Sequence, residues 1–175
     1  ESLERDISDV LVVVRDRPRH DDLGRARRAA GARIRFITDG YLSPAISACV
    51  EGTAVHAVMG IGGAPEGVLA AAAIRCLGGD MQGQLVEYQD GDRERAEGMG
   101  INNFHKIRTA EMLAPGKHLI LAATGVTDGE LMKGVTFWGG GCRTNSIVMG
   151  TGEPRRVRFV DTIHLDDDRA PYIKL

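Results

Sequence analysis

Cysteine is scarce in this sequence of 175 residues, and its three cysteines are widely spaced and form no CxxC pair. A disulfide framework and a cysteine-rich zinc site are therefore not expected, and a reducing cytoplasm is the expected location. The chain also lacks long apolar runs, and its first residues, ESLERDISDV, show no signal-peptide pattern. We therefore expect no membrane span and no secretion signal.

Neither sign of charge dominates, because 22 Lys and Arg face 24 Asp and Glu and leave a formal net charge of −2. This balance argues against general binding to nucleic acid or to a membrane surface, although it allows a local basic pocket. Prolines number only six, and the hydrophobic fraction of 43% is enough to form a core. Disorder, collagen and coiled coil are excluded, and we expect a single domain over residues 1–175.

The first part of the chain alternates strands and helices. A continuous β-branched run at 10–14 predicts a strand buried on both faces, and further strands are expected at 33–37 and 55–59. Helices are expected at 21–30, 42–50 and 68–77. Three such units in succession predict a mostly parallel α/β sheet.

The second part of the chain is less regular. We expect a helix at 90–99, followed by four strands with no helix between them, at 118–123, 133–138, 144–149 and 155–163. Strands without intervening helices pair antiparallel. The predicted fold is therefore α/β, a three-layer α/β/α sandwich with a mostly parallel sheet and an antiparallel edge.

Three loops are expected at the carboxyl ends of the parallel strands, where open α/β sheets bind ligands. The first carries Arg17 and Arg19, whose planar guanidinium groups suit a phosphate. Arg17 and Arg19 also fit a second role as solvated loop residues or partners of Asp21 and Asp22, and taken alone they favour that role. The second loop carries Asp39 and Gly40.

The third loop is the glycine-rich turn 60–67, which lies between a strand and a helix. Its free N–H groups at a helix start suit an anion, yet its sequence matches neither the dinucleotide fingerprint nor a Walker loop. Glu66 would repel an anion there unless a divalent cation lay between them. Two roles for Glu66 stay open, a ligand of such a cation and a carboxylate that only complements the helix dipole.

Other reactive residue types show no such pattern. Two roles are open for the turn 122–129, which carries two hydroxyls: it lines the site or it only changes the chain direction, and the second role is favoured. Core or surface roles are expected for the histidines, which have no metal-ligand spacing, and burial as small apolar residues is expected for the cysteines. The residues concerned are His20, His56, His105, His118, His164, Cys49, Cys76 and Cys142.

Taken together, the loops closely resemble those of the class II fructose-1,6-bisphosphatases, a family of the lithium-sensitive phosphatase superfamily. The resemblance rests on Arg17-Pro-Arg-His20, Thr38-Asp-Gly40, the run Met59-Gly-Ile-Gly-Gly-Ala-Pro-Glu-Gly-Val and Ala123-Thr-Gly-Val-Thr-Asp-Gly129. It extends from about residue 10 to residue 164 and covers the C-terminal half of the family.

The resemblance implies a hydrolase that removes the 1-phosphate of fructose 1,6-bisphosphate, and in some members of sedoheptulose 1,7-bisphosphate, with Mg²⁺ or Mn²⁺. It implies that Glu66 is a metal ligand and that no catalytic residue lies in this half. Contacts to the sugar bisphosphate are implied for Arg17, Pro18, Arg19, Asp39, Gly40, Tyr41 and Gly63. The implied partners are the substrate, the family's N-terminal half and further copies of the chain.

The chain departs from the family pattern in three ways. The Gly-Glu-Gly-Glu and Asp-Pro-Ile-Asp-Gly-Thr motifs, which hold most metal ligands and the catalytic threonine, are not found in these 175 residues. Tyr41 replaces the second aspartate of the family's Asp-Gly-Asp, and Asn145 replaces the histidine of its Thr-His-Ser.

Two further functions compete with the phosphatase half. One is a catalytically silent domain that binds a sugar phosphate or assembles with a partner. The other is a doubly wound nucleotide-binding module, against which the imperfect glycine pattern argues. The missing motifs also predict that the 175-residue chain has no appreciable phosphatase activity by itself, because one carboxylate cannot hold a hard divalent cation.

Overall fold

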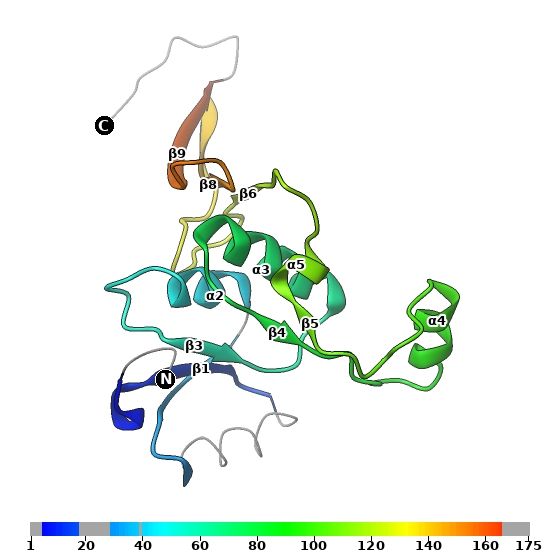
Figure 1. Ribbon diagram of the computed structural model, residues 1–175. Helices are drawn as coiled ribbons and strands as arrows, with labels where there is room; N and C mark the ends of the chain where they lie inside the picture. The colour runs from blue at the N-terminus through cyan, green and yellow to red at the C-terminus, as the bar shows by residue number, and fades with distance from the viewer. Residues whose placement is uncertain (1–4, 18–28, 39, 166–175) are drawn as a thin grey trace.

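A computed structural model describes residues 5–17, 29–38 and 40–165 (Figure 1). A short 3-10 helix, η1 (Ile7–Asp9), leads into a parallel sheet in the order β2-β1-β3. These strands are β1 (Leu11–Arg15), β2 (Arg33–Ile37) and β3 (Ala57–Met59). The central β1 is buried at Val12, Val13 and Val14, which explains its uninterrupted β-branched run.

Two helices, α2 (Leu42–Ala48) and α3 (Ala64–Leu77), lie next to this sheet (Figure 1). The buried face of α3 includes Ala70, Ala71 and Ala73. Side chains this small let α2 and the short helix α5 (Ala110–Leu113) pack closely against it. The alanine-rich composition of α3 is therefore a packing requirement as well as a helix-forming one.

The last strands form an antiparallel sheet with β8 at its centre. Its members are β6 (Ile120–Thr124), β7 (Thr136–Trp138), β8 (Gly141–Gly150) and β9 (Arg156–Leu165). On one side β8 pairs along its whole length with β9, and on the other it pairs with β7 and then with β6. Ile147 and Met149 of β8 pack with Leu121 against Ile46 of α2 and Cys76 of α3, so these helices lie between the two sheets.

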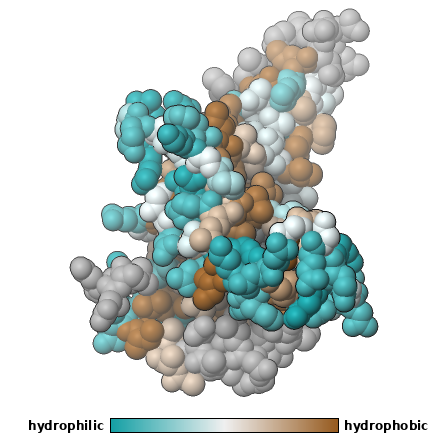
Figure 2. All heavy atoms as spheres, turned by 45° about the vertical axis from the view of Figure 1, so that its right-hand side comes forward, coloured by the Kyte–Doolittle hydropathy of each residue, from teal (hydrophilic) through white to brown (hydrophobic). Residues whose placement is uncertain are grey.

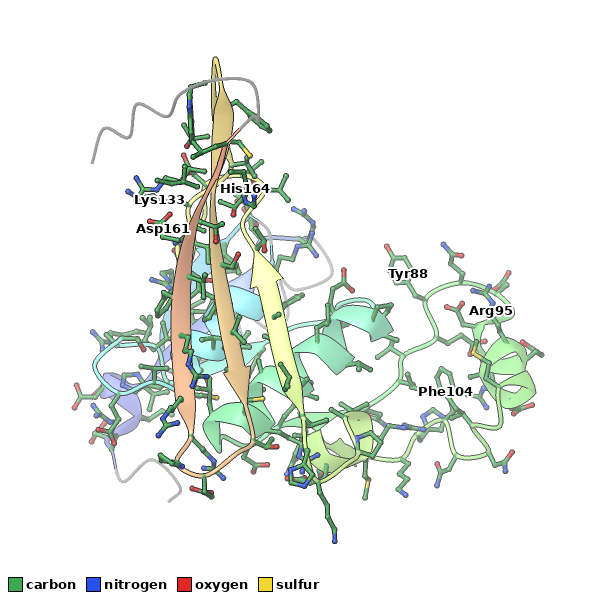
Figure 3. All side chains as sticks on the ribbon, turned by 90° about the horizontal axis from the view of Figure 1, so that it is seen from above. Tyr88, Arg95, Phe104, Lys133, Asp161 and His164 are labelled. Carbon is green, nitrogen blue, oxygen red and sulfur yellow. The ribbon has the colours of Figure 1, made fainter. Side chains whose placement is uncertain are left out.

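A small unit projects from the body between the two-residue strands β4 (Gln82–Gly83) and β5 (Arg108–Thr109). It contains α4 (Asp92–Gly98), which stands apart from the rest of the chain in Figures 1 and 3. Phe104 is only 8% exposed, and its ring lies beneath the guanidinium of Arg93 at 5.4 Å. Around this small core Tyr88 and Met99 remain exposed. Figure 2 shows one face of the molecule, on which hydrophobic and hydrophilic side chains are both exposed.

The structure confirms the α/β class and the parallel pairing of the first three strands. The expected antiparallel strands are present, but they pair in a sheet of their own on the other side of α2 and α3. The helix expected at 21–30 falls mostly outside the described residues. Helix α3 begins four residues earlier than expected, because Gly63 serves as its N-cap and Pro65 fits its first turn.

The three cysteines are free, as expected. Cys76 is buried at 1% exposure, whereas Cys49 and Cys142 are half-buried. Burial raises the pKa of the Cys49 and Cys76 thiols. Within the residues described, no helix is long and apolar enough to cross a membrane.

Candidate functional site

The carboxyl ends of β1, β2 and β3 meet at one edge of the parallel sheet. Arg15 lies opposite Ile37, and Val14 lies opposite Met59, so the three loops that follow start side by side. The Asp16 N–H donates to the Ile37 carbonyl at 2.7 Å and extends the pairing one residue into the first loop. Chain order and parallel pairing therefore place the predicted loops at a common edge.

The first loop is described only as far as Arg17. Its Nη1 donates to the carbonyl of Asp16 at 2.9 Å, which turns the guanidinium back toward the end of β1. Pro18, Arg19 and Asp39 lie outside the described residues. Their contacts to a sugar bisphosphate, like that of Arg17, stay predictions.

Tyr41 connects the second loop with the third. Its hydroxyl donates to the Ile61 carbonyl at 3.3 Å, and its ring lies against the α carbons of Gly60 and Gly62. A Cβ at Gly60 would collide with the Tyr41 hydroxyl, and a Cβ at Gly62 would lie 3.0 Å from Cε2 of the ring. The two glycines are therefore needed for the close approach of this phenol, independently of any ligand.

Arg15 brings the end of β1 into the same cluster. Its guanidinium carbon lies 5.8 Å from the centre of the Tyr41 ring, within the range of a cation–π interaction. The ring thus contacts a cation from the first strand and the backbone of the glycine-rich turn. We call Arg15, Tyr41 and Gly60–Gly62 the tyrosine cluster.

Glu66 lies next to this cluster in the first turn of α3. Gly63 is the N-cap of the helix and provides no side-chain cap bond, so the Glu66 carboxylate folds back against the Gly63 α carbon. Glu66 and Gly63 are both exposed, and Gly40 is exposed as well. A negative charge here is favourable to the helix dipole. The carboxylate is also open to solvent, as a ligand of a cation at this edge would need to be.

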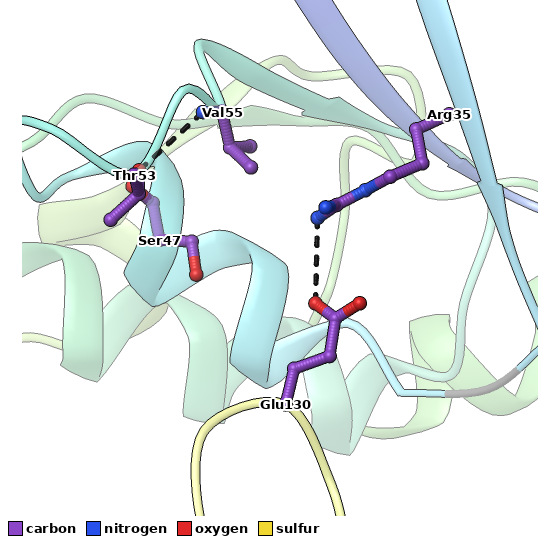
Figure 4. Close-up of polar contacts among 5 residues, drawn as sticks. All are labelled: Arg35, Ser47, Thr53, Val55 and Glu130. Atoms are coloured by element: carbon purple, nitrogen blue, oxygen red, sulfur yellow. Dashed lines mark hydrogen bonds and ion pairs between the residues drawn. The ribbon is translucent and has the colours of Figure 1, made fainter.

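A fourth loop reaches toward the parallel sheet from the antiparallel one. Glu130, between β6 and β7, accepts a hydrogen bond from Nη2 of Arg35 on β2 at 3.4 Å (Figure 4). Two hydrogen bonds hold the loop in place. The Gly134 N–H donates to Asp128 within the loop at 2.9 Å, and the Gly125 N–H donates to the Asn145 carbonyl on β8 at 3.0 Å. The stretch that contains Asp128 therefore acts as a turn, in agreement with the simpler of its expected roles.

A groove of about 860 Å³ runs along the helix-facing side of the antiparallel sheet. Its walls include Trp138, Lys133 and the ion pair of Arg143 with Asp161, in which Nε donates to Oδ1 at 2.7 Å. Lys133 and Asp161 lie close together in Figure 3. The side-chain oxygen of Asn145 accepts from the Lys133 N–H at 3.3 Å, so Asn145 positions the fourth loop.

The described residues supply only part of a metal site. Among them, no group of three or more His, Cys, Asp or Glu side chains lies close enough to hold a metal ion. Glu66 is a hard oxygen donor of the kind that Mg²⁺ and Mn²⁺ prefer, so it fits as one ligand of a larger shell. His56 has a structural role instead, because its Nδ1 accepts from the Leu11 N–H at 2.9 Å.

Sequence reasoning did not find Arg15, Glu130 or the groove. Arg15 is the last residue of a strand, and a basic residue at a strand end does not by itself indicate a binding site. Its role became visible only with its contact to the Tyr41 ring. Glu130 lies 95 residues from Arg35, and the groove depends on how the loop between β6 and β7 lies against the antiparallel sheet. Tyr41 was expected to contact the substrate and to depart from the family pattern, but its packing against the glycine-rich turn was not expected.

Comparison with known proteins gives a consistent result. The sequence profile described as "Bacterial fructose-1,6-bisphosphatase, glpX-encoded" matches residues 1–164. A protein of Synechococcus sp. (strain JA-3-3Ab) is 50% identical over 183 aligned residues, which cover 98% of this chain and 52% of that protein. A protein of Microcystis aeruginosa is 49% identical, covering 99% of this chain and 53% of that protein.

Both relatives carry the name D-fructose 1,6-bisphosphatase class 2/sedoheptulose 1,7-bisphosphatase. A protein of Synechococcus elongatus with the same name is 47% identical, covering 96% of this chain and 52% of that protein. The chain therefore spans about half the length of the curated relatives that it matches.

Proposed function

Since the chain belongs to the bacterial fructose-1,6-bisphosphatase family, we propose that it forms the sugar-phosphate-binding half of a metal-dependent phosphatase. The substrate of that phosphatase is fructose 1,6-bisphosphate, with sedoheptulose 1,7-bisphosphate as a second substrate, and the bond hydrolysed is that of the 1-phosphate. The observation that carries the proposal is the tyrosine cluster beside Glu66, at the carboxyl edge of a parallel sheet.

In this proposal the loop arginines bind phosphate. Arg17 and Arg19 form charge-assisted hydrogen bonds to one phosphate of the substrate, and the backbone at Gly63 supports a second anionic group. Asp39 and Gly40 contact the sugar hydroxyls. Tyr41 presents its hydroxyl oxygen as an acceptor to the sugar while the same hydroxyl donates to Ile61, so its position is fixed before substrate arrives.

Glu66 is the residue of this half that would hold a divalent cation. Mg²⁺ or Mn²⁺, when bound, polarises a phosphoryl group and favours attack by water. The remaining ligands are proposed to come from the half of the family that these residues do not match, as a part of the same chain or as a separate subunit. Oligomers of the complete protein in the cytoplasm are part of the same proposal.

A second candidate function is a catalytically silent domain that binds a sugar phosphate or assembles with a partner. It is supported by the metal-ligand count, because the described residues offer Glu66 and no cluster of further ligands around it. Both candidates share the binding role of the loops. They differ in whether binding leads to hydrolysis.

The test compares the 175-residue chain with a version that carries the family's N-terminal half, measuring phosphate release from fructose 1,6-bisphosphate with Mn²⁺. We expect release from the longer version and none above background from the shorter one. Turnover by the shorter chain at a comparable rate would overturn the division of labour. Inactivity of both, with substrate still binding to the chain, would favour the silent domain.

A further inference from the structure

The far end of α3 carries a second pocket that the phosphatase proposal does not use. It has a volume of about 320 Å³ and lies where α3 ends, beside the loop after α5 and the turn between β8 and β9. Glu66 and Arg75 are nine residues apart on α3, or about 13 Å along the helix axis. The pocket is therefore separate from the tyrosine cluster.

Three cationic side chains line the pocket, namely Arg75, Lys117 and Arg155. Arg75 is held in place, because its Nη1 donates to the carbonyls of Ala114 at 2.6 Å and Gly116 at 2.8 Å. The same two bonds fix the position of the chain just before Lys117. The hydrogen bonds of Arg75 therefore hold its guanidinium and the backbone next to Lys117 in a fixed relative position.

Arg155 approaches the pocket from the turn that follows β8. Its guanidinium lies directly against the α carbon of Gly78, so closely that a Cβ there would overlap it. Gly78 has φ of +79° and ends α3, and the N–H groups of Gly78 and Gly79 both donate to the Ile74 carbonyl. Glycine at this position satisfies the left-handed turn and also leaves room for the cation.

Thr151 ties the two cationic segments together. Its hydroxyl donates to the Lys117 carbonyl at 3.1 Å and accepts from the Leu119 N–H at 3.0 Å. The backbone that carries Lys117 is thereby joined to the turn that carries Arg155. The separation of the two cations is set by this link as well as by their own flexible stems.

One carboxylate also lines the pocket, but its charge is already engaged. The N–H of its own residue, the hydroxyl of Thr109 and the charge of Arg75 all lower the pKa of Glu111. Across the described part of the chain, neither Lys117 nor Arg155 forms an ion pair. Among the described lining residues, three cations against one carboxylate leave an excess of two positive charges around a concave polar space.

We propose that this pocket binds a phosphoryl group, either as free phosphate or as the terminal group of a phosphomonoester. The excess charge matches a dianion, and the lining offers guanidinium and ammonium donors without an apolar wall. A competing explanation is that the cations only complement the negative end of the helix dipole of α3. The two explanations differ in whether an added anion binds.

The experiment is an NMR titration of the ¹⁵N-labelled 175-residue chain with inorganic phosphate and, separately, with methyl phosphate, at constant ionic strength. Glycine amides report on each place independently, with Gly78 and Gly79 for this pocket and Gly62 and Gly63 for the proposed substrate loops. We expect saturable shifts at Gly78, Gly79 and Thr151. Tighter binding of methyl phosphate identifies an ester as the ligand, and tighter binding of phosphate identifies the free ion.

Lys117→Gln and Arg155→Gln should each raise the dissociation constant measured at Gly78 by about tenfold and leave the shifts at Gly62 unchanged. Arg158→Gln is the matched control, since it removes the same charge from β9 outside the pocket and should leave the constant unchanged. The proposal is overturned if Gly78, Gly79 and Thr151 do not shift. It is also overturned if both pocket variants lower the melting temperature and leave the shifts at these residues intact. If only Gly62 and Gly63 do not shift, the result contradicts the proposed substrate binding by the loops and leaves the pocket proposal standing.

Discussion

The parallel and antiparallel sheets on either side of α2 and α3 use their charged residues differently. In the antiparallel sheet, Arg143 is paired with Asp161 on the neighbouring strand. At the edge of the parallel sheet, Glu66 is exposed in the first turn of a helix that has no side-chain cap. The first arrangement uses charge to join strands, and the second leaves charge available to a ligand.

Glycine residues also have different roles near the two sheets. In the loop between β6 and β7, Gly125 and Gly134 allow backbone segments of one loop to approach each other. At the parallel edge, Gly60 and Gly62 make room for the side chain of Tyr41, which comes from a different loop. Close packing between loops brings side chains from distant parts of the chain to one place, as a binding site requires.

The largest effect is expected from Glu66→Gln in the complete enzyme. Loss of a charged ligand from the shell of a divalent cation should lower kcat by at least about a hundredfold while the fold persists, and added Mn²⁺ should restore only part of it. The measurement combines kcat, metal dependence and melting temperature. Glu97→Gln, an exposed change on the projecting α4, is the control for loss of one charge.

A dipole role alone predicts the opposite pattern for Glu66→Gln. The melting temperature would fall, corresponding to about 0.3–1 kcal/mol, and kcat would stay near normal. That result would mean that Glu66, like the Arg143–Asp161 pair of the antiparallel sheet, stabilises the fold and does not serve a ligand. The two sheets would then not differ in how they use charge.

The next largest effect is expected from Arg17→Ala and Arg19→Ala, measured separately in the complete enzyme. Each should raise KM for the bisphosphate about ten- to a hundredfold, since a charge-assisted pair to phosphate contributes about 1.5–3 kcal/mol. Arg158→Ala on β9 should leave KM unchanged. If KM stays the same in both loop variants, the arginines are solvated loop residues.

Stability should respond to glycine replacement according to what lies next to each glycine. Gly60→Ala places a methyl group against the Tyr41 ring and should cost about 1–3 kcal/mol in the free energy of unfolding. Gly67→Ala, on α3 with open space around it, should instead stabilise by about 0.5–1 kcal/mol. Urea denaturation of both variants provides the comparison.

The cause of the Gly60→Ala effect can be isolated by combining it with Tyr41→Ala. When the ring is already absent, adding the methyl group should cost much less than it does in the native chain. Equal costs in the two backgrounds would mean that the ring does not limit the turn.

The smallest effect concerns pH and the Arg143–Asp161 pair. The Arg143 guanidinium lowers the pKa of Asp161, so the pair stabilises the fold above the ordinary aspartate pKa and loses this contribution as pH falls through the lowered one. Asp161→Asn should therefore lower the melting temperature slightly at pH 7, and its difference from the native chain should shrink below about pH 4 and vanish once the pH is below the lowered pKa of Asp161. Asp90→Asn, which removes an exposed carboxylate at the tip of the projecting unit, is the control for the loss of one negative charge.

Local sequence patterns predicted the parallel sheet well. Residues 33–37 form the expected strand without any change of bounds, and the run at 10–14 is displaced by one residue. These strands are decided by their own β-branched residues. By contrast, β8 extends from Gly141 to Gly150, well beyond the expected 144–149, because ladders to β6, β7 and β9 hold residues with weak strand preference.

The location of the candidate site could be predicted from the sequence, but only some of the contacts that form it could. Chain order alone put the loops at one edge of the sheet, since parallel strands share their carboxyl ends. The sequence did not reveal that Tyr41 would rest on Gly60, or that Arg15 would cover the ring, because these contacts depend on how three loops pack. The contact between Arg35 and Glu130 could not be predicted for the same reason, and its two residues are even farther apart in the sequence.

The projecting unit between β4 and β5 offers protein engineers a place to add sequence. Its tip, near Gly91, is exposed and reverses direction with φ of +86°, far from α3 and both larger sheets in Figure 1. Exposed tips of this kind tolerate inserted peptides better than positions inside paired strands do. A fluorescent reporter or an affinity tag placed there would leave the tyrosine cluster and the α3 pocket unobstructed, so binding at each could be followed by an internal label.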